Sequence, residues 1–258
     1  MSGINFQRTY QLGDGYEGVQ ERARLKLAKY WEYPNLITFK DQDRSVTFTT
    51  ERLIPTLALN RPRVMLLFSN PHPHSVDQGM FLSPNTIGRE NQFWPVMEKA
   101  GWLPIPKEDR TPAQLANICL NVSYEGPFDL IFYCYYAFPT DYPKDIQEIF
   151  GKVYFNQTIE PQSKDEFQKT IQELSTEAVV TFNKGVFNLV SKEPVARYID
   201  RLKAGELIQS QIKGVDKHIP IFLTFPTGWR FHKDYRDLRV ASLDRIRKAI
   251  CSASRSSG

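Results

Sequence analysis

A short apolar run in this sequence is followed directly by side chains that can do chemistry. Residues 64–68 are all apolar, and Ser69, Asn70, Pro71 and His72 come next. An apolar run that stops at Asn-Pro is typical of a buried strand that ends in a turn. A carboxamide at the end of such a strand can orient a water molecule toward a substrate, although it is too weak a base to deprotonate that water fully.

An aromatic residue and a helical pattern follow this loop. Phe81 comes ten residues after Pro71, and residues 93–100 then place apolar side chains at helical spacing before Gly101 ends the pattern. An aromatic ring near a water-orienting amide can stack on a flat heterocycle. The order of strand, loop, aromatic residue and helix therefore predicts chemistry on a nucleobase.

Further apolar runs alternate with helical patterns along the rest of the chain. The runs predict strands at residues 129–138, 179–182 and 219–225, and the patterns predict helices at residues 16–33, 163–178 and 238–251 and after Gly185. Such alternation is typical of an α/β fold with a mostly parallel sheet. In such sheets, sites form at the carboxyl ends of the strands, where Asn70, Phe138 and Pro226 are expected.

The composition limits the class of protein. The 258 residues are 41% apolar and 24% charged, which suits one domain with a full core. The longest apolar run, residues 130–138, is too short to cross a bilayer, and the N-terminus lacks the apolar stretch of a signal peptide. We therefore expect a soluble intracellular protein, in the cytoplasm or beside DNA in a nucleoid or nucleus, with no membrane partner.

The cysteine and histidine spacings predict no metal site and no disulfide framework. The three cysteines, Cys119, Cys134 and Cys251, lie far apart and form no CxxC pair. His72 and His74 lack a neighbouring set of acidic ligands, so a metal pair is not indicated.

Positive charge gathers at the C-terminal end. The formal net charge is +4, and residues 229–258 hold eight Lys or Arg against three Asp. Each of these charges alone is explained by a solvated helix face, and together they permit a polyanionic partner without requiring one.

Four segments together resemble the uracil-DNA glycosylase superfamily, and most closely its mismatch-specific uracil/thymine branch. In that branch a G-x-N-P loop ends the first strand, an aromatic residue follows, an N-x-F-W segment opens the next helix, and a P-S-containing loop follows the last strand. The matching segments are residues 67–71, 79–81, 91–102 and 225–228. The resemblance implies a three-layer α/β/α sandwich around a central, mostly parallel four-stranded sheet.

The resemblance also implies a domain organisation and a partner. Residues 1–258 would form a single glycosylase-like domain, with residues 1–60 as an N-terminal helical extension and residues 252–258 as a frayed tail. The protein would act as a monomer, without metal or cofactor, on duplex DNA that carries a damaged or mismatched base. Its reaction would be hydrolysis of the bond between sugar and base, as in base excision repair.

Site residues are carried over by position. Asn70 would orient the attacking water, and His72 is the second catalytic candidate. The base-binding candidates are Phe68, Ser69, Phe81, Cys134 and Tyr135. The DNA-binding candidates are Thr227, Gly228, Trp229, Arg230, His232 and Lys233, with Trp229 as a wedge that fills the space left by the flipped nucleotide.

Three residues depart from the family pattern. Phe68 stands where glycine is usual, next to the leaving base, where its ring would narrow or close the pocket. His72 replaces a glycine or tyrosine. Phe225 stands where many members have a histidine, so that His72, His74 or His232 would have to assist the departure of the base.

Two other function classes remain open. The first is a nucleic-acid or nucleobase binding protein on the same fold, made inactive by Phe68 and Phe225. The second is an amino-methyltransferase, because residues 69–72 loosely resemble an N-P-P-aromatic motif, although no glycine-rich loop for the methyl donor follows a strand.

Overall fold

The computed structural model describes residues 4–85, 87–227 and 235–255, and these form one mixed sheet with helices on both faces. The sheet has eight strands in the order β1-β3-β5-β4-β6-β8-β7, and β2 pairs with β3 beside this path. The strands are β1 (Asn5–Gln11), β2 (Ile37–Lys40), β3 (Ser45–Leu53), β4 (Arg63–Phe68), β5 (Asp129–Cys134), β6 (Ala178–Thr181), β7 (Ile208–Gln211) and β8 (Pro220–Leu223). The predicted α/β class is confirmed. The predicted four-stranded sheet is wrong, because β1, β2, β3 and β7 enlarge it with antiparallel pairs.

The four strands expected from apolar runs make the parallel part of this sheet. β4 lies between β5 and β6, and β8 follows β6, with parallel pairing throughout. Nearly every residue of these strands is buried, because both faces are covered, and this explains their continuous apolar sequences. The carboxyl ends of β4 and β5 meet at Phe68 and Cys134. The segments that follow these two strands therefore lie at one edge of the sheet.

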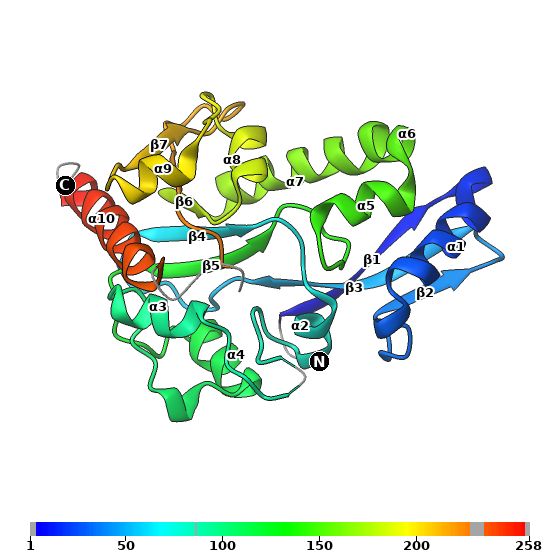
Figure 1. Cartoon of the computed structure of the whole chain (residues 1–258), viewed down its shortest axis with the longest axis horizontal. Helices are drawn as coiled ribbons and strands as arrows, with labels where there is room; N and C mark the ends of the chain where they lie inside the picture. The colour runs from blue at the N-terminus through cyan, green and yellow to red at the C-terminus, as the bar shows by residue number, and fades with distance from the viewer. Residues whose placement is uncertain (1–3, 86, 228–234, 256–258) are drawn as a thin grey trace.

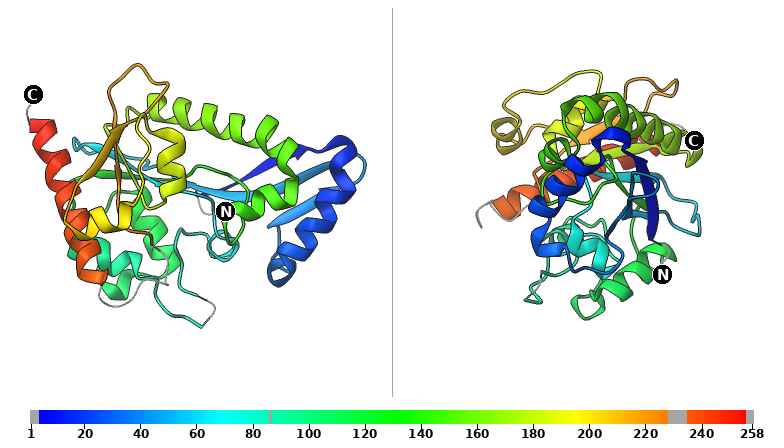
Figure 2. Two further views of the ribbon diagram at one scale, coloured as in Figure 1. Left: turned by 45° about the horizontal axis from the view of Figure 1, so that its top comes forward. Right: turned by 90° about the vertical axis from the view of Figure 1, so that its right-hand side faces the viewer.

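Helices cover the two faces of the sheet, with α5, α7 and α8 on one side and α3, α4 and α10 on the other (Figures 1 and 2). Alternate residues of β4 serve the two resulting cores, since successive side chains of a strand point to opposite faces. Met65 and Leu67 enter the first core, and Val64, Leu66 and Phe68 enter the second. The helices are α1 (Tyr16–Lys26), α2 (Pro73–Gln78), α3 (Phe93–Lys99), α4 (Pro112–Leu120), α5 (Pro143–Phe150), α6 (Lys152–Tyr154), α7 (Glu160–Glu173), α8 (Lys184–Val190), α9 (Tyr198–Lys203) and α10 (Tyr235–Arg255).

The first sixty residues are not simply the predicted helical extension. They contain α1, but β1, β2 and β3 also belong to the main sheet, and β3 joins β5 through the pairs Arg52–Tyr133 and Leu53–Phe132. In Figure 1 this part lies at the right of the molecule, continuous with the sheet. The N-terminal segment therefore extends the sheet beyond β5, and its apolar side chains enter the same two cores.

Several element boundaries differ from those expected. The predicted helix start at Ser163 is wrong, because this residue is buried inside α7, which begins at Glu160. The predicted strand 129–138 ends at Cys134, and its last four residues are buried without strand pairing. The expected frayed tail begins too early, since α10 continues to Arg255. Among the described residues, no helix combines the length and apolar character needed to cross a bilayer.

Candidate functional site

A cleft of about 400 Å³ opens at the carboxyl edge of the parallel strands. Its walls come from the segments after β4, β5, β6 and β8 and from one residue of β3. Its volume lies in the range of small-molecule sites, roughly 300–1,000 Å³. Seven predicted site residues line the cleft: Phe68, Ser69, Asn70, His72, Phe81, Cys134 and Thr227. Glu51, Thr140 and Asp141 line it too, and their sequence context did not single them out.

The Asn70 carboxamide is held in one orientation. Its Nδ2 donates to the Thr140 carbonyl oxygen at 2.7 Å, to Thr140 Oγ1 at 3.0 Å and to the Pro71 carbonyl oxygen at 3.2 Å. Its Oδ1 accepts from the Ser69 hydroxyl at 2.9 Å. Because an amide nitrogen has two donors and an amide oxygen has two acceptor positions, the remaining capacity of the group is one acceptor position on Oδ1. Asn70 is therefore built to accept a hydrogen bond at the cleft, as from a water molecule.

His72 belongs to a polar cluster at the mouth of the cleft. Its Nδ1 accepts from the His74 amide at 3.3 Å, and its Nε2 lies 3.2 Å from Asp141 Oδ1. Asp141 also accepts from the Tyr30 hydroxyl at 2.6 Å and pairs with Lys29 at 2.6 Å. These contacts assign the proton of the neutral ring to Nε2, and both ring nitrogens are engaged.

The charges of this cluster agree with a neutral imidazole. Burial lowers the pKa of His72, against the attraction of Asp141. Although its own burial acts in the opposite direction, the hydrogen bonds from Lys29 and Tyr30 hold the pKa of Asp141 below its usual value. The cluster therefore ties the N-terminal segment to the loops after β4 and β5. In this arrangement His72 lies at the mouth of the cleft and links the loop after β4 to Asp141 in the loop after β5.

The aromatic wall of the cleft belongs to a larger cluster of phenylalanines. The Phe68 ring stacks on Phe182, with centroids 5.5 Å apart and an interplanar angle of 8°. Phe81 packs against Phe68 and Phe132, each at 5.6 Å, and only 2% of it is exposed. The Phe68 ring therefore forms part of the cleft wall and does not fill the cleft. Phe81 reaches the cleft with only a small part of its surface, so its role as the main stacking ring stays a prediction.

Glu51 places a buried carboxyl group at the cleft. Only 3% of this residue is exposed, and its Oε2 has no hydrogen-bond partner among the described residues. Burial raises the pKa of Glu51 well above its usual value. Burial also raises the pKa of Cys134, and the neighbouring Glu51 carboxyl adds to this effect. The Glu51 carboxyl therefore holds its proton to a higher pH than an ordinary glutamic acid does, and the Cys134 thiol is neutral near pH 7.

The elevated pKa of Glu51 predicts a specific dependence of stability on pH. Below about pH 4 the carboxyl is protonated in both the folded and the unfolded chain, so it does not favour unfolding. Above that pH the unfolded chain loses the proton first, and the folded state loses stability until the pH passes the folded-state pKa. Glu51→Gln cannot ionise. We expect its free energy of unfolding to equal that of the parent near pH 4 and to exceed it by about 1–3 kcal/mol at pH 7.

Urea denaturation of both chains across this range measures the difference. A Glu21→Gln variant serves as the control, because Glu21 is exposed on α1. A constant difference between Glu51→Gln and the parent from pH 4 to pH 7 would contradict the prediction.

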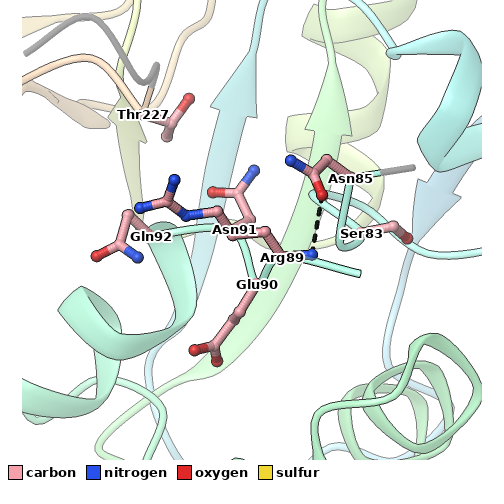
Figure 3. Close-up of a pocket in the computed structure, with 7 residues that line it drawn as sticks. All are labelled: Ser83, Asn85, Arg89, Glu90, Asn91, Gln92 and Thr227. Carbon is pink, nitrogen blue, oxygen red and sulfur yellow. Dashed lines mark hydrogen bonds between the residues drawn. The ribbon is translucent and has the colours of Figure 1, made fainter. Parts of the chain in front are cut away.

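A smaller pocket of about 170 Å³ adjoins the cleft and shares Thr227 with it. In Figure 3 the side chain of Thr227 lies across this pocket from Ser83, Asn85 and residues 89–92, which form its other wall. Within this wall, Asn85 Oδ1 accepts from the Arg89 amide at 2.8 Å. Amide and hydroxyl side chains line the pocket together with Arg89 and Glu90, and the amides, hydroxyls and guanidinium can donate to phosphate or sugar oxygens.

Not all predicted residues gather at the site. Tyr135 does not line the cleft, because its ring enters the opposite core and packs against Phe167 and Tyr136. Its assignment to base binding is therefore corrected. Gly228, Trp229, Arg230, His232 and Lys233 lie outside the described residues. Within the described ranges, no group of three or more His, Cys, Asp or Glu is placed to hold a metal ion.

No family model matches the chain, and no curated protein sequence matches it.

Proposed function

We propose that the chain is a DNA glycosylase-like hydrolase that cleaves the bond between the sugar and a flipped uracil or another mismatched or damaged base. The observation that carries this proposal is the oriented carboxamide of Asn70, with one acceptor position left, at a cleft of base-accommodating size. Two of the segments on which the sequence resemblance rests, residues 67–71 and 225–228, follow the parallel strands β4 and β8 and reach this cleft.

The proposed reaction needs only modest help from Asn70. A water molecule that donates to Asn70 Oδ1 would direct its lone pair at C1′ of the sugar. Its oxygen bonds to C1′ while the bond from C1′ to the base nitrogen breaks, and the electron pair of that bond leaves with the base. The water proton passes to solvent once the sugar cation has been captured. Because a carboxamide is a weak base, bond breaking runs ahead of bond formation.

The approach of DNA is supported by the side of the cleft that holds Thr227. Arg239 lines a small recess with Pro226 and Thr227, and Arg236 lies one helical turn away on α10. The spacing of three residues places the two cations on neighbouring turns of α10, and burial and the nearby charge of Arg236 lower the pKa of Arg239. Two adjacent guanidinium groups next to a hydroxyl favour a phosphate.

The proposal is tested with duplexes that carry uracil, thymine or hypoxanthine opposite guanine. We expect alkali-labile abasic sites with at least one of these bases, and faster release from single strands or mismatches, where flipping costs less. DNA binding without any abasic site would exclude hydrolysis.

The second candidate is a nucleobase-binding protein without hydrolytic activity. It is favoured by one observation: Phe225 is buried, and the ring nitrogens of His72 and His74 are engaged by protein groups. These residues therefore offer no donor to the departing base. The same assay separates the candidates, because this protein would bind the duplexes and leave them intact.

A further inference from the structure

Among the described residues, Glu51 is the one buried acid that lines the cleft, and its Oε2 has no hydrogen-bond partner in the protein. It lies on β3, opposite Asn5 of β1 and one residue before the Arg52–Tyr133 pair with β5. Asn5 Nδ2 donates to the Val76 carbonyl oxygen at 2.6 Å. Asn5 Oδ1 and Glu51 Oε2 are both buried without partners among the described residues, so they do not bond to each other.

A buried carboxyl group without a partner is costly for the fold. The other acid at the cleft, Asp141, has Lys29, Tyr30 and His72 around it, which explains its presence. Burial is the cause that raises the pKa of Glu51, and the Cys134 thiol is a neighbour whose own pKa the Glu51 carboxyl raises. The apolar ring of Phe68 lines the same cleft as Glu51. The missing partner of Glu51 is therefore expected from a ligand.

We propose that Glu51 acts as a neutral carboxylic acid that reads the hydrogen-bonding edge of the base in the cleft. Its hydroxyl donates to a ring carbonyl oxygen, and its carbonyl oxygen accepts from the adjoining ring N–H. This pair of bonds matches the edge of uracil, thymine or hypoxanthine, in which C=O and N–H are neighbours. The inference rests on the proposed function in that it places a base in this cleft.

The same donor gives the leaving base a partner that the histidines do not supply. As the bond to the sugar breaks, negative charge develops on the base and spreads to its ring oxygens. A hydroxyl that donates to one of these oxygens stabilises the charge, and in a site shielded from water this effect is strong. Glu51 is thus assigned both the recognition of the base and the stabilisation of its anion.

Two methylated bases test the assignment in the unmodified protein. 1-Methyluracil carries its methyl group where the sugar is attached and keeps the edge with N3–H, whereas 1,3-dimethyluracil has no ring N–H. We expect calorimetry at pH 7 to show 1-methyluracil binding at least about tenfold more tightly, because the blocked edge leaves buried polar groups unpaired. Equal affinity for the two bases, or no binding of either at millimolar concentration, would overturn the inference.

Two variants connect this preference to Glu51. Glu51→Gln keeps one donor and one acceptor, so we expect it to bind 1-methyluracil within about threefold of the parent. Glu51→Leu removes both, so we expect a loss of at least about tenfold. Glu21→Leu, an exposed site on α1, is the control. If Glu51→Leu bound 1-methyluracil as the parent does, Glu51 would have no role in recognition.

The design separates this inference from the proposed function. A preference for 1-methyluracil that depends on Glu51, together with intact DNA in the abasic-site assay, would support the recognition role and exclude hydrolysis. Abasic-site formation at unchanged rate and unchanged base preference in Glu51→Leu would overturn the recognition role and leave the hydrolase.

Discussion

Replacement of Asn70 by alanine is expected to lower the rate of base release by about 10²–10⁴-fold, the range typical of a positioned catalytic group. The variant loses the acceptor position assigned above to the attacking water, and the substitution lies two residues beyond the end of β4. DNA affinity is expected to stay within about threefold, because phosphate contacts provide most of it. Single-turnover release of base from a uracil-containing duplex measures the rate, and binding at matched salt measures the affinity.

Two further variants place the effect on the carboxamide itself. Thr140→Val removes the hydroxyl that accepts from Asn70 Nδ2 but keeps the carbonyl oxygen, so a smaller loss of about tenfold is expected. Asn121→Ala, on an exposed asparagine at the end of α4, should release base at the parental rate. A parental rate in Asn70→Ala would refute the catalytic assignment, and a parallel loss of rate and DNA binding would assign Asn70 to binding.

The parallel strands were predictable because burial on two faces leaves a clear mark in the sequence. Residues 64–68 and 129–134 are apolar at almost every position, and only a strand covered on both sides requires that. The helix α3 was predictable for a similar reason, since its apolar residues recur at helical spacing and Gly101 ends it with a φ of +70°. These elements position Asn70, so its place at the edge of the sheet followed from local patterns.

The pairing of the N-terminal strands and the burial of Glu51 were not predictable in this way. β3 contains three threonines and the pair Glu51-Arg52, a composition that is typical of an exposed strand. Glu51 becomes buried only because β1 pairs with β3 on one side and β5 pairs with it on the other. Such burial depends on contacts between residues far apart in the chain, and no local spacing records it.

Side-chain direction explains the remaining differences at the site. Cys134 and Tyr135 are adjacent in the sequence, and the last paired residue of β5 sends its side chain to the cleft while the next one turns to the opposite core. Thr140 follows in the loop, where its carbonyl and hydroxyl oxygens meet Asn70, 70 residues earlier in the chain. An apolar run predicts that a strand exists, but it does not show at which residue the strand ends. Because side chains alternate along a strand, that end point decides which of them reach the site.

The role of the Phe68 ring differs most between the sequence-based expectation and the structure. From the family pattern its ring was expected to close the pocket, so that a smaller residue would open it. In the structure the ring is a buried part of the aromatic cluster, stacked on Phe182 and in contact with Phe93 and Phe132. The cleft beside it already has a volume of about 400 Å³. Removal of the ring would therefore empty the core and not unblock the site.

We accordingly expect Phe68→Ala to lower the free energy of unfolding by about 3–5 kcal/mol, the usual cost of removing a buried phenylalanine ring. Phe68→Leu, which keeps much of the volume, should cost less, and Phe6→Ala, at a partly exposed position on β1, should cost about 1 kcal/mol. Urea denaturation at pH 7 measures all three. A ring that only blocks the cleft could be removed without loss of stability, whereas a ring packed in the core could not. If Phe68→Ala kept parental stability and bound 1-methyluracil more tightly, the ring would therefore be an obstruction of the cleft.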